Sequence, residues 1–296
     1  MCHIWQKQGK ATYLSVNEID NFLSDQLLGN YLERINLTGG EPTLYHELVK
    51  LVGVFINRCP SLKNIDMPTN GINSGLVLEE IEKILALLFP TNITLSVTVS
   101  LDGIGPIHEK VRNIPRIFDS VNRTIQGIKE LKSLYKSNLC VNLNATINKI
   151  NYNCLDRLLN YAREHELGIN FTPAAISEVG VESIKVKDKF ALSNMEKEQV
   201  AVFFEKLIRD SVIDKTYGRF VINWLKNRKR RVGCIFKQGK AFLLEPTGDV
   251  YLCGNFKDFK LGNIKENKFS NIWRNMNSLK SHFWKNCDHC VSNCYL

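Results

Sequence analysis

Five cysteines crowd the C-terminal part of the chain and could together hold a metal. Cys234 and Cys253 flank the segment KAFLLEPTGDVYL, and Cys287, Cys290 and Cys294 follow near the end. The flanked segment is predicted to be a hairpin, because two apolar runs surround the turn residues PTGD, and a hairpin returns its ends to the same place. Converging thiolates bind zinc or an iron–sulfur cluster, and ligand type alone leaves both open. We favour Cys234, Cys253, Cys287 and Cys290 as ligands, with Cys294 as the alternative fourth.

A glycine-rich turn is the second candidate for chemistry. In the stretch RINLTGGEPTLY, residues 34–45, a predicted strand runs into Gly39, Gly40 and Glu41. Paired glycines let the backbone turn sharply and let a ligand approach the main chain. Glu41, at the end of the strand, is an acceptor placed for a cation such as an ammonium group. Such a turn is also ordinary α/β loop chemistry, so its meaning depends on the rest of the chain.

Alternating strands and helices must position these residues. The apolar patterns predict strands at 34–37, 64–67, 92–101, 139–147 and 168–172, and helices at 17–28, 44–58, 76–89, 117–135 and 154–165. Repeated strand–helix units predict a parallel sheet with right-handed crossovers. No strand precedes the first helix. We therefore expect an α/β fold, namely a partial TIM-type (β/α)6 barrel whose first strand is missing and whose 34–37 strand is an exposed edge. A small cysteine-rich α+β domain follows it.

Polar residues recur where the predicted strands end. These are Gly39-Gly40-Glu41, Thr69-Asn70-Gly71, Ser100 to Gly103, Asn144 to Thr146, and Thr172-Pro173. In barrels and in open α/β sheets, sites form at the carboxyl ends of the strands. Five such groups in phase predict one shared pocket.

Composition narrows the class of protein. The 296 residues are 44% hydrophobic, no apolar run has membrane-spanning length, and the start MCHIWQKQGK has no signal-peptide pattern, so we expect a cytoplasmic protein without membrane contact. The net charge is +9, but Lys and Arg are spread along the chain, and the dense run KNRKRR at 226–231 is typical of a solvated helix end. A nucleic-acid partner is therefore not favoured. Cys59, Cys140 and Cys154 sit singly in apolar segments and are predicted to fill the core.

Taken together, these motifs resemble a radical S-adenosylmethionine (SAM) enzyme with a C-terminal SPASM or twitch domain, over essentially the whole chain. LTGGEPTLY at 37–45 matches the family's turn that holds the amino group of SAM. VSLDGIGPIHEKVRNIPRIFD at 99–119 resembles the segment in which a Ser and an Arg contact SAM. GDVYLCGNF with LGNIKENKFSNIW resembles the SPASM hairpin and its sequel. The resemblance implies that the SAM-binding residues are Gly39, Gly40, Glu41, Ser100, Arg112 and Asn144. Asp102 is either a turn residue or a substrate contact, and His108 is structural.

The start of the chain departs from the family's pattern. MCHIW resembles the last piece of the CxxxCxxC loop, with Cys2 as its third cysteine, and the first two cysteines are absent. We expect that the sequence is truncated at an internal methionine and that the chain as given is inactive. The alternative is a degenerate homologue without a cluster.

The resemblance also implies the chemistry. Three cysteines hold a [4Fe–4S] cluster, whose electron cleaves SAM to a 5′-deoxyadenosyl radical that abstracts hydrogen from the substrate. The resemblance also favours one auxiliary iron–sulfur cluster over zinc at the C-terminal cysteines. The implied substrate is a peptide or polar small molecule, and the implied electron donor is a flavodoxin or ferredoxin.

The expected domains are the radical SAM core at 1–190, linker helices at 191–233 and the SPASM or twitch domain at 234–296. Two readings compete with a radical SAM enzyme. One is a basic binding module stapled by zinc, and the other is a non-catalytic remnant.

Overall fold

The computed structural model describes residues 13–174, 189–227, 233–254, 260–274, 276 and 290. Three of the predicted metal ligands, Cys2, Cys287 and Cys294, lie outside the described residues, as does most of the basic run at 226–231. The chain forms two compact units. The first comprises residues 15–146 and 154–171, and the second comprises residues 147–153 and the described residues from 172 onward.

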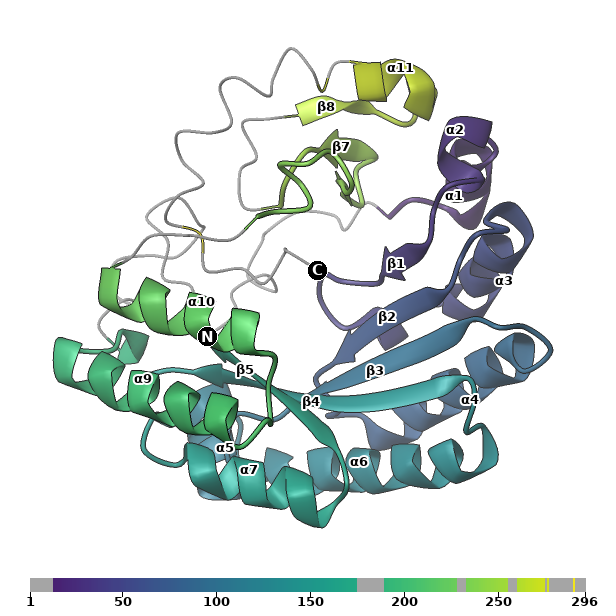
Figure 1. Cartoon of the computed structure of the whole chain (residues 1–296). Helices are drawn as coiled ribbons and strands as arrows, with labels where there is room; N and C mark the ends of the chain where they lie inside the picture. The colour runs from purple at the N-terminus through teal and green to yellow at the C-terminus, as the bar shows by residue number, and fades with distance from the viewer. Residues whose placement is uncertain are drawn as a thin grey trace. The chain divides into compact units, whose positions relative to one another are not determined.

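A five-stranded sheet forms the centre of the fold (Figure 1). Its strands follow one another in chain order and are β1 (Arg34–Asn36), β2 (Asn64–Thr69), β3 (Thr94–Ser100), β4 (Leu139–Ile147) and β5 (Gly168–Pro173). The pairs from β1 to β4 are parallel, with Ile65 opposite Leu95 and Val97 opposite Val141. This arrangement confirms the α/β fold and is that of a partial TIM-type barrel. Within the described sheet β1 is an edge strand, as expected.

Helices cover one face of this sheet. Figure 1 shows α3 (Leu48–Arg58), α4 (Ser74–Leu88), α6 (Ile117–Leu134) and α7 (Leu155–Glu164) on the same side. Two short helices, α1 (Val16–Leu23) and α2 (Gln26–Gly29), precede β1, and a 3-10 turn, η2 (Pro42–Leu44), follows it. The short helix α5 (Pro106–Arg112) lies between β3 and α6.

The strands bury alternate side chains, so one face of the sheet is buried against these helices. In β3 the side chains of Leu95, Val97 and Val99 are fully buried, and the residues between them are half-buried. Successive side chains of a strand point to opposite faces. The opposite face therefore carries short polar side chains in β3 and β4, namely Thr94, Ser96, Thr98, Ser100, Cys140, Asn142, Asn144 and Thr146.

Several boundaries differ from the sequence prediction for local reasons. The predicted helix 17–28 is two helices, because the Asp25 carboxylate accepts from the Leu27 N–H at 3.0 Å and so begins α2 anew. Ser15 caps α1 with a capping box. The helix expected from residue 44 begins at Leu48, after η2. Helix α5 was not predicted.

The second unit contains a helix pair and a small sheet. The helices are α9 (Asn194–Arg209) and α10 (Lys215–Asn227). Strands β6 (Leu243–Leu244) and β7 (Asp249–Tyr251) form the predicted antiparallel hairpin, and β8 (Lys260–Asn263) pairs with β7, before α11 (Phe269–Arg274). Gly248 has φ +93°, a conformation that favours glycine in the turn. None of the described helices is both long and apolar enough to cross a membrane.

Candidate functional site

The glycine turn after β1 is open among the described residues. Gly39 has φ +131°, a conformation that side chains rarely adopt. A Cβ atom built on Gly39 or on Gly40 would meet no atom of the described part of the chain within 4 Å. Binding of a ligand against this backbone stays a prediction.

Glu41 joins the end of β1 to the end of β2. Its Oε1 accepts from the Thr43 hydroxyl at 3.0 Å, and its Oε2 accepts from the Asn70 N–H at 2.7 Å. Thr43 is buried, so the carboxylate is held by a fixed donor. Each carboxylate oxygen has a second acceptor position, which leaves Glu41 able to receive an ammonium N–H as well.

Ser100 and Asn144 meet at the carboxyl ends of β3 and β4. They are directly opposite in the strand register, and the Leu101 N–H donates to the Asn144 carbonyl at 2.9 Å. Both side chains belong to the polar face of the sheet and are half-buried. The structure thus brings together two of the residues that the sequence predicted for one pocket.

Arg112 is the last residue of α5 and pairs with a buried carboxylate. Its Nε lies 2.7 Å from Oδ2 of Asp102, whose side chain is 0% exposed. The other carboxylate oxygen accepts from the Thr146 N–H, at the end of β4, at 2.8 Å. Burial raises the pKa of the Asp102 carboxyl, while the Arg112 charge and the Thr146 N–H act in the opposite direction. Asp102 is therefore a buried link between β3, β4 and α5 in this structure.

His108 completes this link from within α5. Its Nδ1 accepts from the Asp102 N–H at 3.0 Å, and only 1% of the residue is exposed. Burial, and then the nearby Arg112 charge, lower the pKa of His108 to about 4. The ring is thus neutral near pH 7 and carries its proton on Nε2. Within the described part of the chain, that buried Nε2 has no hydrogen-bond partner.

The residues predicted to contact SAM lie at or near the ends of β1, β3, β4 and α5. Gly39, Gly40 and Glu41 follow β1, Ser100 ends β3, Arg112 ends α5, and Asn144 lies within β4, near its end. The role of Asp102 was missed. The available signal was a carboxylate directly after a predicted strand, ten residues before an arginine on a short amphipathic segment.

The described residues give no geometry for either predicted cluster. Cys234 and Cys253 are buried, and Cys290 is half-buried. Among the described residues no three His, Cys, Asp or Glu side chains gather into a possible metal site.

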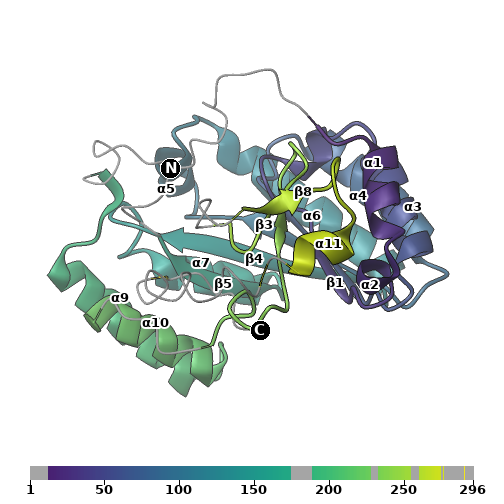
Figure 2. The same ribbon diagram turned by 90° about the horizontal axis from the view of Figure 1, so that it is seen from above.

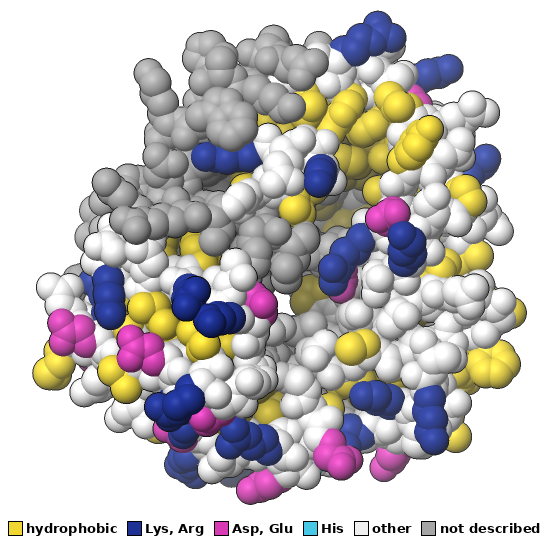
Figure 3. Space-filling model, viewed as in Figure 1, with side chains coloured by type: hydrophobic (Ala, Val, Ile, Leu, Met, Phe, Trp, Pro, Cys, Tyr) yellow, Lys and Arg dark blue, Asp and Glu magenta, His cyan; other side chains and the backbone are white. Residues whose placement is uncertain are grey.

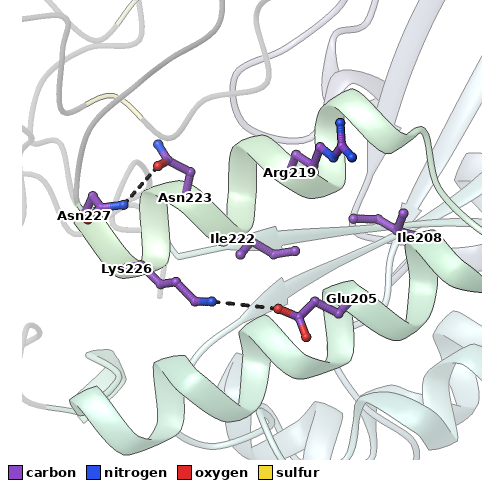
Figure 4. A pocket seen from close by; sticks show the side chains of 7 residues that line it. All are labelled: Glu205, Ile208, Arg219, Ile222, Asn223, Lys226 and Asn227. Atoms are coloured by element: carbon purple, nitrogen blue, oxygen red, sulfur yellow. Dashed lines mark hydrogen bonds and ion pairs between the residues drawn. The ribbon is translucent and has the colours of Figure 1, made fainter.

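A groove of about 400 Å³ lies on the surface of the second unit between α9 and α10 (Figure 4). Its lining mixes both signs of charge with apolar side chains, namely Glu205, Ile208, Arg219, Ile222, Asn223, Lys226 and Asn227. Lys226 Nζ lies 3.8 Å from Glu205 Oε1 across the groove. Lys and Arg side chains are also dispersed over the face that Figure 3 shows, with Asp and Glu among them. No predicted site residue lines this groove.

Comparison with known families identifies the class of protein. The radical SAM superfamily model matches residues 1–162, which is more than half of the chain. The SPASM model, an iron–sulfur cluster-binding domain, matches residues 234–295. The chain therefore belongs to the radical SAM superfamily and carries a SPASM domain. The cofactors of these two families are SAM with a [4Fe–4S] cluster, and auxiliary iron–sulfur clusters.

Two curated proteins are similar to the chain. A probable GTP 3′,8-cyclase from Sulfurisphaera tokodaii is 26% identical over 164 residues, which cover 55% of this chain and 47% of that protein. A GTP 3′,8-cyclase from Shewanella denitrificans is 25% identical over 187 residues, which cover 61% of this chain and 50% of that protein. The chain thus spans about half the length of these relatives.

Proposed function

We propose that the chain is a radical SAM modifying enzyme that removes a hydrogen atom from a peptide or a polar metabolite. The observation that carries the proposal is the set of polar groups at the carboxyl ends of β1 to β4, beside a glycine turn with open space. When bound, a reduced [4Fe–4S] cluster would supply the electron for cleavage of SAM to methionine and a 5′-deoxyadenosyl radical, which would take the hydrogen atom from the substrate. Under this proposal residues 1–190 are the catalytic core, 191–233 are linker helices and 234–296 are the auxiliary-cluster domain.

The residues present fit the polar end of SAM. The open side of Gly39 and Gly40 leaves room beside the backbone, where a larger residue would project a side chain. Glu41 offers carboxylate acceptors for the ammonium group. Arg112 offers guanidinium donors, which suit a carboxylate. The donor set therefore matches an amino acid that carries both charges.

Ser100 and Asn144 complete the proposed site with neutral groups. Their side chains are short and half-buried, and they stand opposite each other at the ends of two strands. A hydroxyl and an amide can donate to the SAM carboxylate or to the ribose and can also accept from the ribose. Their fixed position in the sheet would orient the ligand without adding a charge.

The polar face of the sheet supports the proposed substrate class. Thr98 and Asn142 are opposite each other there, in the middle of β3 and β4, and both are half-buried. Such short polar groups favour a substrate with amides or hydroxyls over an apolar one. The similar cyclases are named for GTP, which is itself a polar metabolite. The proposed electron donor is a flavodoxin or ferredoxin.

The test of this proposal is Glu41→Gln in the anaerobically reconstituted chain. The amide oxygen can still accept from the Asn70 N–H, and the amide nitrogen can donate to Thr43 Oγ1, so the fold should remain. Loss of the negative charge should weaken SAM binding roughly tenfold or more, because hydrogen bonds to charged groups contribute about 1.5–3 kcal/mol. Equilibrium dialysis with labelled SAM measures the binding, which does not depend on turnover.

The matched control is Glu79→Gln, which removes an exposed carboxylate that pairs with Lys83 on α4. It should leave SAM binding unchanged. If the reconstituted wild-type chain carried its [4Fe–4S] cluster but bound no SAM, the proposed function would be refuted. Equal SAM affinity in Glu41→Gln and wild type would remove Glu41 from the site.

A further inference from the structure

Arg112 is held from one side and open on the other. Its Nε is buried and lies 2.7 Å from Oδ2 of Asp102, in an ion pair whose geometry is not that of a hydrogen bond. Yet 23% of the side chain is exposed. Because Nε is not part of that exposed area, a ligand can reach Arg112 only through its other atoms, which include the two terminal nitrogens. A guanidinium held by Nε can still offer those terminal donors to an anion.

Asp102, the partner of Arg112, is itself held by burial and by two hydrogen bonds. It is fully buried, its Oδ1 accepts from the Thr146 N–H, and its own N–H donates to His108. The residue after it approaches α5 closely. A Cβ atom on Gly103 would lie 2.4 Å from Cγ2 of Ile107, so only glycine lets α5 pack this near to the end of β3.

From this geometry we infer that Asp102 is a positioning residue that sets the direction of the Arg112 guanidinium and ties it to the strand ends where Ser100 and Asn144 stand. The inference rests on the proposed function, since the anion that Arg112 would receive is the carboxylate of SAM. Asp102 itself is too deeply buried to touch a ligand. An arginine held by a buried carboxylate loses less side-chain freedom when it binds, which favours affinity.

Asp102→Asn tests the inference with little change of shape. The asparagine oxygen can still accept from the Thr146 N–H, but its amide group brings no charge to Arg112 and can place a donor against Nε–H. The expected result is a loss of SAM affinity of about tenfold, measured by equilibrium dialysis on the anaerobically reconstituted chain. Removal of one buried partner can also destabilise the fold, so the unfolding midpoint is measured for every variant.

A double-mutant cycle separates positioning from general stability. If Asp102 acts through Arg112, Asp102→Asn should cost affinity in the wild-type background and nothing further in an Arg112→Met background. A merely structural role predicts the same loss in both backgrounds and would overturn the inference. The matched control is Asn138→Ala, at the opposite end of β4, where Nδ2 of the buried Asn138 donates to the carbonyls of Leu88, Thr91 and Ile93. This control should lower stability and leave SAM affinity unchanged.

A second measurement needs no SAM. The Arg112 side chain should be rigid in the wild-type chain and mobile in Asp102→Asn, as read from ¹⁵N relaxation of its Nε–H group. Equal mobility in the two proteins would overturn the inference while leaving the proposed function standing. A wild-type chain that carries its cluster but binds no SAM would overturn both.

Discussion

At the scale of single residues, His108 should make the stability of the fold depend on pH. Its pKa is lowered to about 4 in the folded chain, from an ordinary value of 6.5, so the unfolded chain takes up this proton first as the pH falls. The stability that the neutral ring provides is complete above pH 6.5 and is lost between about pH 6.5 and 4. From pH 7.5 to 5 the free energy of unfolding should fall by about 2 kcal/mol through His108, as measured by urea unfolding at each pH.

The comparison variant for this prediction is His108→Phe, which does not titrate. It should be less stable than wild type at pH 7.5 by about 1–3 kcal/mol, because the buried Asp102 N–H loses its acceptor. Its free energy of unfolding should also fall less between pH 7.5 and 5, because the phenyl ring takes up no proton. Arg112 and Asp102 face the ring. The raised pKa of Asp102 adds stability as the pH falls, which opposes the effect of His108, and it does so in both proteins. Parallel pH profiles of the two proteins would contradict the prediction.

At the scale of elements, α5 is placed by the close contact at Gly103. Gly103→Ala would put a Cβ atom 2.7 Å from Cβ of Ile107 and 3.0 Å from the backbone nitrogen of His108, so the helix must shift. We expect a loss of about 1–3 kcal/mol in the free energy of unfolding, together with weaker SAM binding as Arg112 moves. Thermal unfolding and equilibrium dialysis measure the two effects.

The control for the Gly103 prediction is Gly53→Ala in the middle of α3. A Cβ atom there meets no atom of the described residues within 4 Å, so alanine should raise stability by about 0.5–1 kcal/mol. SAM binding should not change. A Gly103→Ala protein as stable as wild type would show that α5 can move without cost.

Element patterns explain what the sequence could predict. The alternation in β3 and β4 is long and regular, so both strands were predicted to within two residues, whereas their polar face was not predicted. Helix α5 was missed because it spans seven residues, too few to show a helical period, and because Gly105 precedes it and Pro106 begins it. The link through Asp102 depends on that helix. Its partners are 6, 10 and 44 residues away in the chain, and no local pattern joins them.

At the scale of the whole molecule, iron content should separate an enzyme from a zinc-stapled binding module. We expect the anaerobically purified chain to be brown and to contain iron with acid-labile sulfide. The double variant of Cys234→Ala and Cys253→Ala should lose the iron of the auxiliary cluster, since both thiols fall in the part matched by the cluster-binding domain. Metal and sulfide analyses measure this directly.

Cys140→Ala is the control for the iron prediction, because Cys140 lies in the sheet of the core and is not a predicted ligand. Its iron content should equal that of the wild type. A colourless protein with one zinc per chain would contradict the enzyme proposal and support the binding module.

The alternating burial of β3 and β4 has a consequence for evolvability. Residues that hold the sheet to its helices, such as Val97 and Val141, alternate along each strand with residues such as Thr98 and Asn142 that face away from them. Substitutions in the second group leave the helix-packed core untouched. A lineage, or a designed library, could therefore explore new substrates through every second residue while the scaffold keeps its stability.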